Sequence, residues 1–252
     1  MKTSNYDQYV TAISSFSGDP CASSLLMAED GAVSVYYAPF EWVNQRAKVV
    51  LVGITPGKTQ AANALAEAQR ALRDGASADE VLRRARATGA FSGAMRPNLV
   101  SLLDEVGLQH WLGLKTCNEL FQSQSHLLQT ASVLQYPVFL SGANYNGTPD
   151  PINHPLLQTM VIEHFATLCR QLSAAVFVPL GPVPTKTLAW LAARGVVSPT
   201  RILSGLPHPS GANAERIKYF LGQKNKADLS KKTDPDKLDL AKASLIHAIS
   251  TL

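Results

Sequence analysis

An apolar run, Val49–Val52, followed by the residues GITPGKT at 53–59, constrains the fold more than any other part of the chain. Such a run, ended by glycine and proline, predicts a buried strand and a tight turn that opens a helix near Thr59. Three residues separate Gly53 from Gly57, whereas a nucleotide-binding P-loop has four. Pro56 also removes one of the backbone N–H groups that a phosphate would need. The run predicts an α/β protein and disfavours a P-loop, although a nucleotide site that depends on Lys58 stays open as an alternative.

The bulk properties favour one globular domain over residues 1–252, because 46% of the 252 residues are hydrophobic and α/β domains of this size are common. Within this domain we expect a core at about 48–221, a helical insertion at about 59–88 and a lysine-rich C-terminal extension at about 224–252. A net charge of +4 and a pI near 9.0 are compatible with a polyanionic partner without requiring one.

Cysteine spacing argues against a metal centre. The three cysteines lie far apart and form no C-x-x-C pair, so neither a zinc site nor an iron–sulfur cluster is expected from them. The N-terminus lacks the apolar stretch of a signal peptide, and no run approaches the ~20 residues of a membrane span. We therefore expect a soluble, cytoplasmic monomer that needs no metal or nucleotide cofactor and no membrane.

Helix-like and strand-like patterns alternate along the chain. Helices are expected at 59–87, with a break at Gly75, and at 97–106, 156–172, 185–193, 213–221 and 240–249. Strands are expected at 48–54, 112–116, 174–180 and 201–205, a loop at 141–151 and a polar tail at 224–239. This alternation predicts a three-layer α/β/α arrangement with a mostly parallel central sheet.

Four loops would then gather at the carboxyl edge of the sheet, where α/β proteins place their functional groups. They are 53–57, the segment with Asn118, the loop after Leu180, and 208–213. His208 stands between two prolines, which fix its backbone; a rigid turn with an idle histidine is the alternative. Ser210 and the backbone of the two residues after it precede a predicted helix, and helix N-termini can bind phosphate.

The order and spacing of these motifs resemble the uracil-DNA glycosylase superfamily over about 48–221. The matching features are the G-x-x-P-G turn after the first strand, an asparagine after a middle strand, and a late H-P-S motif before a helix. The stretch "GAFSGAMRPNLVSLLDEVGL" is similar to the iron–sulfur branch, and "HPSGAN" to the single-strand-selective branch. The cluster cysteines of the former are absent, so its cofactor is not carried over.

The resemblance implies a DNA base glycosylase, an enzyme that flips a uracil-like or modified pyrimidine out of DNA and hydrolyses its N-glycosidic bond to leave an abasic site. It assigns His208 to stabilising the negative charge that grows on the leaving base and Asn118 to the edge of that base. It also implies that Phe91 stacks on the base, although the alternative that Phe91 packs in the core stays open. The remaining residues that it implies are Gly53 and Ile54 for the base and Gly57, Lys58, Ser210, Gly211 and Asn213 for the DNA backbone.

Thr55 departs from the family pattern, because much of the family has an acidic residue or asparagine there to position or activate the attacking water. A threonine hydroxyl can orient a water but cannot act as a carboxylate base. Three outcomes are then open: the reaction is slower and limited to a good leaving group, another residue supplies the carboxylate, or the activity is lost. Asp150 and Glu119 are the candidates for a replacement carboxylate. Lost activity would leave a DNA-binding module that recognises damaged or modified DNA.

Two longer segments suggest an unusual substrate. The arginine-rich stretch before Phe91 and the loop at 141–151 exceed what a minimal family member needs. The loop offers amide, phenol and carboxylate groups from Asn144, Tyr145, Asn146 and Asp150, which could bind a bulky modified base of invading phage DNA. A purely solvated surface is the alternative for both segments.

Overall fold

The computed structural model describes residues 5–89 and 95–252, which form two compact units. Unit 1 contains the described residues of 1–43, 54–90 and 132–168, and unit 2 those of 44–53, 91–131 and 169–252. The chain passes repeatedly between the units, so each is assembled from segments that are distant in sequence. Each unit has its own sheet, and the protein is α/β.

The sheet of unit 1 is antiparallel and was not expected from the sequence. Its strand order is β1-β2-β5-β6, with β1 at Leu26–Asp30, β2 at Val33–Tyr36, β5 at Val138–Leu140 and β6 at Ala143–Asn144. A two-residue turn, in which Gly31 has a φ of +59°, joins β1 to β2, and Val33 pairs with Leu140. The prediction of a mostly parallel sheet is therefore wrong for this four-stranded sheet.

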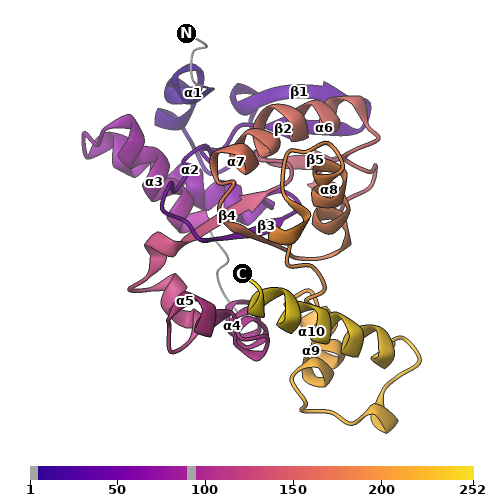
Figure 1. The fold of residues 1–252 in the computed structure, drawn as a ribbon. Helices are drawn as coiled ribbons and strands as arrows, with labels where there is room; N and C mark the ends of the chain where they lie inside the picture. The colour runs from indigo at the N-terminus through magenta and orange to yellow at the C-terminus, as the bar shows by residue number, and fades with distance from the viewer. Residues whose placement is uncertain (1–4, 90–94) are drawn as a thin grey trace. The chain divides into compact units, whose positions relative to one another are not determined.

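Two helices of unit 1 form the predicted hairpin, in which α2 (Lys58–Arg73) and α3 (Ala78–Gly89) lie side by side (Figure 1). Gly75 separates them with a φ of +72°, a conformation that glycine adopts without strain, as predicted. The other helices of this unit are α1 (Asn5–Ser14), the short 3₁₀ turn η1 (Ser23–Leu25), and α6 (Pro155–Met160). A π-helical turn, η4 (Val161–Phe165), continues α6 into α7 (Ala166–Gln171). This continuous run confirms the helix expected at 156–172.

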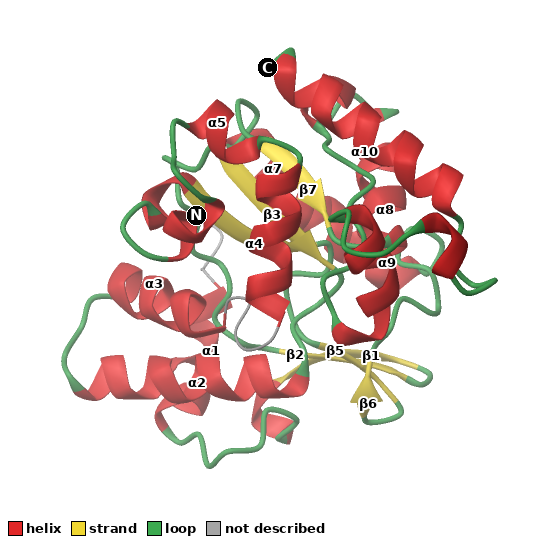
Figure 2. Cartoon of the chain, turned by 90° about the horizontal axis from the view of Figure 1, so that it is seen from below, coloured by secondary structure: helices red, strands yellow, loops and turns green. Residues whose placement is uncertain are grey.

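The sheet of unit 2 contains the strand that the sequence signals most clearly. β3 (Val49–Gly53) lies between β4 (Leu128–Ser132) and β7 (Val176–Pro179). Figure 2 shows β3 and β7 side by side. β3 and β7 are parallel, with Val49 opposite Val176. All four residues of Val49–Val52 are fully buried, which explains why an unbroken apolar run marks this strand. The two predicted strands and their parallel pairing are confirmed.

Helices pack around this sheet in unit 2. They are α4 (Met95–Glu105), α5 (Leu108–Leu112), α8 (Pro182–Ala192), α9 (Ala214–Phe220) and α10 (Pro235–Ser250), with the 3₁₀ turns η2 (Cys117–Phe121), η3 (Ser125–Leu127), η5 (Pro199–Arg201), η6 (Gly211–Asn213) and η7 (Lys226–Asp228). One apolar core joins α4, α5, α9 and α10 to β3 and β7; it includes Leu51, Leu99, Val178, Phe220 and Leu245.

Of two further strands predicted in unit 2, one is wrong and the other forms only in part. Residues 112–116 hold the end of α5 and a turn, because Gly113 closes the helix with a φ of 71° and Thr116 caps η2. Residues 201–205 pair with β7 at a single parallel bridge between Ile202 and Phe177. A longer ladder does not form there because Gly205 turns the chain, with a φ of +123°.

The lysine-rich tail is fastened to the body of unit 2. Glu215 of α9 accepts hydrogen bonds from Lys224 Nζ at 2.7 Å, Ser230 Oγ at 2.6 Å and Thr233 Oγ1 at 2.6 Å. These hydrogen bonds hold the pKa of Glu215 below its ordinary value, and the bond from Lys224 has the largest effect. The last helix starts five residues earlier than predicted, because the Asp234 side chain accepts the backbone N–H of Lys237 and caps it. The tail is therefore an ordered extension rather than a loose linker.

Candidate functional site

The turn after β3 uses its polar groups to hold the fold. Ile54 O accepts the backbone N–H of Leu134 at 2.9 Å. Gly57 N donates to Gln60 Oε1 at 2.9 Å, and Lys58 N donates to Asn144 Oδ1 at 2.9 Å. A P-loop needs such N–H groups for phosphates, so these bonds weigh against the nucleotide alternative. The Lys58 ammonium, exposed and 3.9 Å from Asp19, is the group of this turn that can still meet a DNA phosphate.

The Thr55 hydroxyl both donates and accepts a hydrogen bond. Its Oγ1 donates to Tyr136 O at 3.0 Å and accepts the N–H of Val138 at 3.1 Å. A threonine hydroxyl has one proton, and here a carbonyl already receives it. Thr55 can therefore offer a water at most a lone pair, which agrees with the expectation that it is no carboxylate substitute.

We expect Thr55→Val to lower the free energy of unfolding by about 1–3 kcal/mol, because it leaves the N–H of the buried Val138 without its acceptor. Thr55→Ser keeps the hydroxyl and should lose much less. Urea unfolding of the two variants and the wild type measures the difference. Equal losses in both variants would show that the methyl group, not the hydroxyl, matters at this position.

His208 is held as a neutral hydrogen-bond donor in unit 2. Its Nδ1 accepts the backbone N–H of Ser210 at 3.3 Å, and burial lowers its pKa. A neutral imidazole that accepts at Nδ1 carries its proton on Nε2. A Cβ at Gly181 would lie 3.5 Å from Cδ2 of His208, so the loop after β7 passes directly against the ring. The arrangement presents an uncharged N–H donor from a rigid position.

Helix α4 supports both of the segments that carry His208 and Asn118. Near its start, Asn98 Nδ2 donates to Pro209 O at 2.9 Å. Near its end, Asp104 Oδ1 accepts the N–H of Cys117 at 2.7 Å. Six residues of α-helix separate these two anchors, about 9 Å at 1.5 Å per residue. Asn98 and Asp104 therefore position the two predicted base-contacting segments on one helix, a role that no local sequence pattern indicates.

The remaining predicted DNA contacts of unit 2 form a small network. Asn213 Nδ2 donates to Ser210 Oγ at 3.2 Å, and Arg216 Nη1 donates to Asn213 Oδ1 at 3.2 Å. Open space surrounds the position that a Cβ would take at Gly211. These residues make a preformed turn before α9. Phe91 lies outside the described residues.

The loop at 141–151 in unit 1 satisfies most of its own polar groups. Tyr145 is buried and its hydroxyl donates to Pro149 O. Asn146 Oδ1 accepts the N–H of Thr148 at 3.2 Å, and Asp150 Oδ1 accepts the N–H of Ile152 at 3.1 Å. The loop also contains β6, which the sequence did not predict. Tyr145 is thus a packing residue, and the groups suggested for a modified base largely hold the loop together.

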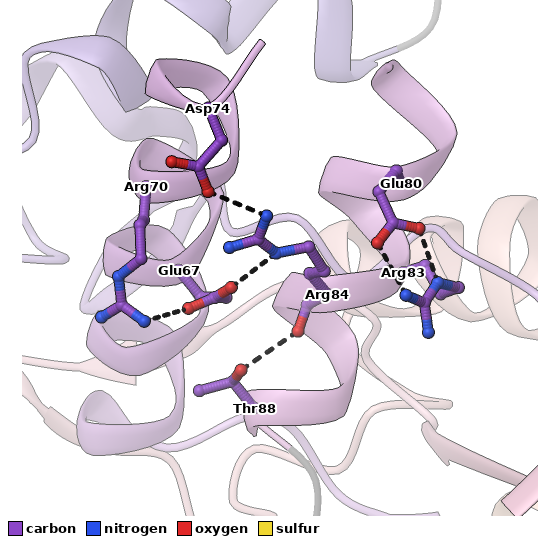
Figure 3. Close-up of polar contacts among 7 residues, drawn as sticks. All are labelled: Glu67, Arg70, Asp74, Glu80, Arg83, Arg84 and Thr88. Carbon is purple, nitrogen blue, oxygen red and sulfur yellow. Dashed lines mark hydrogen bonds and ion pairs between the residues drawn. The ribbon is translucent and has the colours of Figure 1, made fainter. Parts of the chain in front are cut away.

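The arginine-rich hairpin carries paired charges (Figure 3). Glu67 bridges Arg70 at 2.8 Å and Arg84 at 2.7 Å, Arg84 also reaches Asp74 at 3.0 Å, and Arg83 pairs with Glu80. Paired guanidinium groups attract a polyanion less than free ones do. This network favours the interpretation of the hairpin as a solvated surface over that of a DNA-binding face.

A second polar cluster, which the sequence did not indicate, surrounds Glu41 in unit 1. Tyr37 Oη donates to Glu41 Oε2 at 3.3 Å, and Tyr136 Oη donates to Glu41 Oε1 at 3.3 Å. Asn5 Nδ2 donates in turn to Tyr136 Oη at 2.8 Å, and the charge of the buried Arg86 acts on the same carboxylate. We call Asn5, Tyr37, Glu41, Arg86 and Tyr136 the Glu41 cluster.

Burial raises the pKa of Glu41 to about 7, although the two tyrosine hydroxyls and Arg86 oppose the rise. Burial also lowers the pKa of Arg86 to about 10. Part of Glu41 still reaches solvent. A carboxyl group that changes protonation near neutral pH is suited to acid–base chemistry.

Metal and membrane features are absent from the parts of the chain that the structure describes. Within 5–89 and 95–252, no three His, Cys, Asp or Glu side chains gather closely enough to bind a metal ion. None of the described helices has the length and apolar character needed to cross a membrane.

Comparison with known proteins identifies one protein of similar sequence. No protein-family model matches the chain, and no solved structure matches it. Over 206 residues it is 35% identical to the uncharacterized protein YoxB of Bacillus subtilis (strain 168), and the match covers 81% of this chain and 80% of YoxB. The chain therefore belongs to the same family as YoxB.

Proposed function

We propose that the protein is a monofunctional DNA base glycosylase, which hydrolyses the N-glycosidic bond of a flipped uracil-like or modified pyrimidine and leaves an abasic site. The observation that carries the proposal is the hydrogen bond that His208 Nδ1 accepts from the N–H of Ser210, because a neutral imidazole bonded in this way carries its proton on Nε2. Cleavage of the bond leaves negative charge on the base. A preorganised donor stabilises that charge as it develops.

Further features of the chain support the same proposal. The anchoring of the Asn118 and His208 segments on α4 gives a donor and an amide from one rigid support. The motifs that resemble the uracil-DNA glycosylase superfamily extend the proposal to a three-layer glycosylase-like fold, DNA as the partner and a monomeric state. The free thiols of Cys21, Cys117 and Cys169 suit a reducing cytoplasm.

The test is base release from a panel of DNAs that contain uracil, hypoxanthine, other deaminated purines, or glucosylated hydroxymethylcytosine. We expect the wild type to release one base from this panel, and His208→Ala and Asn118→Ala to release the same base far more slowly. Release of the glucosylated base would support a role against modified phage DNA. Release of uracil alone would reject that role and favour repair.

A DNA-binding module is the second candidate, favoured by the engagement of the Thr55 hydroxyl with Tyr136 O. A module without catalysis would release no base from any member of the panel. It would still bind DNA with an affinity that falls steeply as salt rises, and His208→Ala would leave that affinity unchanged.

A further inference from the structure

Positive charge gathers in the C-terminal part of unit 2. Residues 214–252 contain eight lysines and arginines against five aspartates and glutamates, which gives this segment a net charge of +3 out of +4 for the whole chain. Between α9 and α10 (Figure 1) the chain makes a turn at 230–233 that carries Lys231 and Lys232, both exposed. We call residues 230–233 the lysine turn.

Hydrogen bonds fix the shape of the lysine turn. The N–H of Thr233 donates to Ser230 O at 3.0 Å, which closes the turn. Glu215 holds both of its ends, because it accepts the N–H of Ser230 at 3.2 Å and the hydroxyls of Ser230 and Thr233 at 2.6 Å each. The two lysines therefore reach solvent from an ordered backbone, and a partner that binds them does not have to order it.

Arg216 joins the lysine turn to the turn that follows His208. Its Nη2 donates to Lys232 O at 3.1 Å, and its Nη1 donates to Asn213 Oδ1 at 3.2 Å. Both nitrogens belong to one guanidinium group, so the two turns lie side by side within unit 2. Asn213 donates in turn to Ser210 Oγ at 3.2 Å. One hydrogen-bonded path thus connects Ser210 with the lysine turn.

The cations of this surface are not neutralised by carboxylates. Within the described parts of the chain, Lys231, Lys232 and Arg216 form no ion pair, and the two oxygens that accept from Arg216 are uncharged. Glu215, the nearby acid, is paired with Lys224 at 2.7 Å. This surface differs in that respect from the hairpin of α2 and α3, whose arginines are paired, and it attracts a polyanion more strongly.

The chemistry of the surface fits the phosphates of a nucleic acid. Arg216 uses two of its five N–H donors in the bonds described above, and cations on two adjacent turns match a row of phosphates. A membrane surface is the other polyanion to consider, but segments that lie on it also bury apolar side chains. The exposed large hydrophobic residues of the described chain are Ile162, Leu240 and Ile246, all outside 208–237. The observations therefore favour a nucleic acid.

We propose that the lysine turn and Arg216 form a surface that binds the DNA backbone and extends the turn of Ser210 and Asn213. The inference rests on the proposed function for the choice of DNA as the partner. The surface contacts phosphates rather than bases, so it raises affinity for DNA of any sequence. It would hold DNA beside the His208 segment without taking part in the chemical step.

The double variant Lys231→Gln/Lys232→Gln of the full chain tests the surface by fluorescence anisotropy with a short, unmodified DNA duplex at about 50–200 mM salt. The slope of log Kobs against log[salt] should fall in magnitude by about 2, roughly 1 for each lost phosphate contact. At the lowest salt the affinity should fall on the order of tenfold.

Arg46→Gln/Lys48→Gln is the matched control, because it removes the same charge from two exposed side chains of unit 2. Lys48 precedes β3 at the amino end of the parallel strands, whereas the His208 segment follows their carboxyl ends. The control should keep the slope and the affinity of the wild type.

Equal slopes in the lysine variant and the control overturn the surface. Binding to phosphatidylserine vesicles that the lysine variant loses, with an unchanged slope on DNA, overturns it in favour of a membrane contact. Base release from the DNA panel is measured separately with the same proteins. A slope that depends on the lysines without release of any base supports the surface and rejects the glycosylase, whereas base release with equal slopes rejects the surface alone.

Discussion

His208→Ala should lower the single-turnover rate of base release by about 10²–10³-fold, the usual effect of removing one preorganised donor from developing negative charge. The histidine is neutral because burial lowers its pKa, and its Nε2 keeps the proton because Nδ1 accepts from Ser210. The donor therefore acts without first taking up a proton from solvent. The measurement is a rapid-quench time course with enzyme in excess over the DNA that the panel identifies.

His208→Gln is the matched variant, since a glutamine amide can present an N–H donor from a similar distance along the side chain. We expect it to recover part of the rate that alanine loses. Stability measured by urea unfolding should be similar in the two variants. A glutamine variant as slow as the alanine variant would argue that the donor is not what the reaction needs from this position.

Glu41→Gln should make the protein more stable than the wild type at alkaline pH and no more stable at acidic pH. The pKa of Glu41 is raised in the folded state from an ordinary 4.5 to about 7. Its contribution to stability is therefore fully present below pH 4.5 and is lost as the pH rises through 7. A shift of this size corresponds to about 3 kcal/mol, and glutamine does not titrate, so the difference should grow toward that value by pH 8.

Urea unfolding at pH 4.5, 6, 7 and 8 measures this difference directly. Tyr37→Phe provides the comparison, because loss of its hydrogen bond raises the pKa of Glu41 further and should move the fall in stability to higher pH. A difference between wild type and Glu41→Gln that stays constant across the four pH values would contradict a buried, raised-pKa carboxyl at this position.

The parts of the fold that the sequence predicts are those with a local physical signature. β3 and β7 are unbroken apolar runs, and Gly75 separates α2 from α3 because it adopts a positive φ. The antiparallel sheet of unit 1 has no comparable signature. β1 reads LMAED and β6 has two residues, and β2 pairs with β5 across more than a hundred residues of chain.

The site residues divide in the same way. His208 could be selected because prolines flank it, and Asn118 because it matches the asparagine that the resemblance places after a middle strand, although α5 and a turn stand where that strand was expected. Glu41 could not be selected, because nothing local distinguishes it. Tyr37 lies four residues before it, but Arg86 and Tyr136 come from segments that are distant in sequence, and its protonation depends on that enclosure. Asn98 and Asp104 were missed for the same reason, since helix periodicity explains their positions but not their partners.

For the proposed glycosylase, the double anchoring on α4 has a consequence for the engineering of base preference. Asn98 holds the His208 segment and Asp104 holds the Asn118 segment, so a shift of this helix displaces both. Substitutions on the buried face of α4, for example at the fully buried Leu102, should change both the discrimination between bases and the turnover, in a correlated way. Variants that retune specificity alone must instead come from the loops, where one segment can change while the other keeps its place.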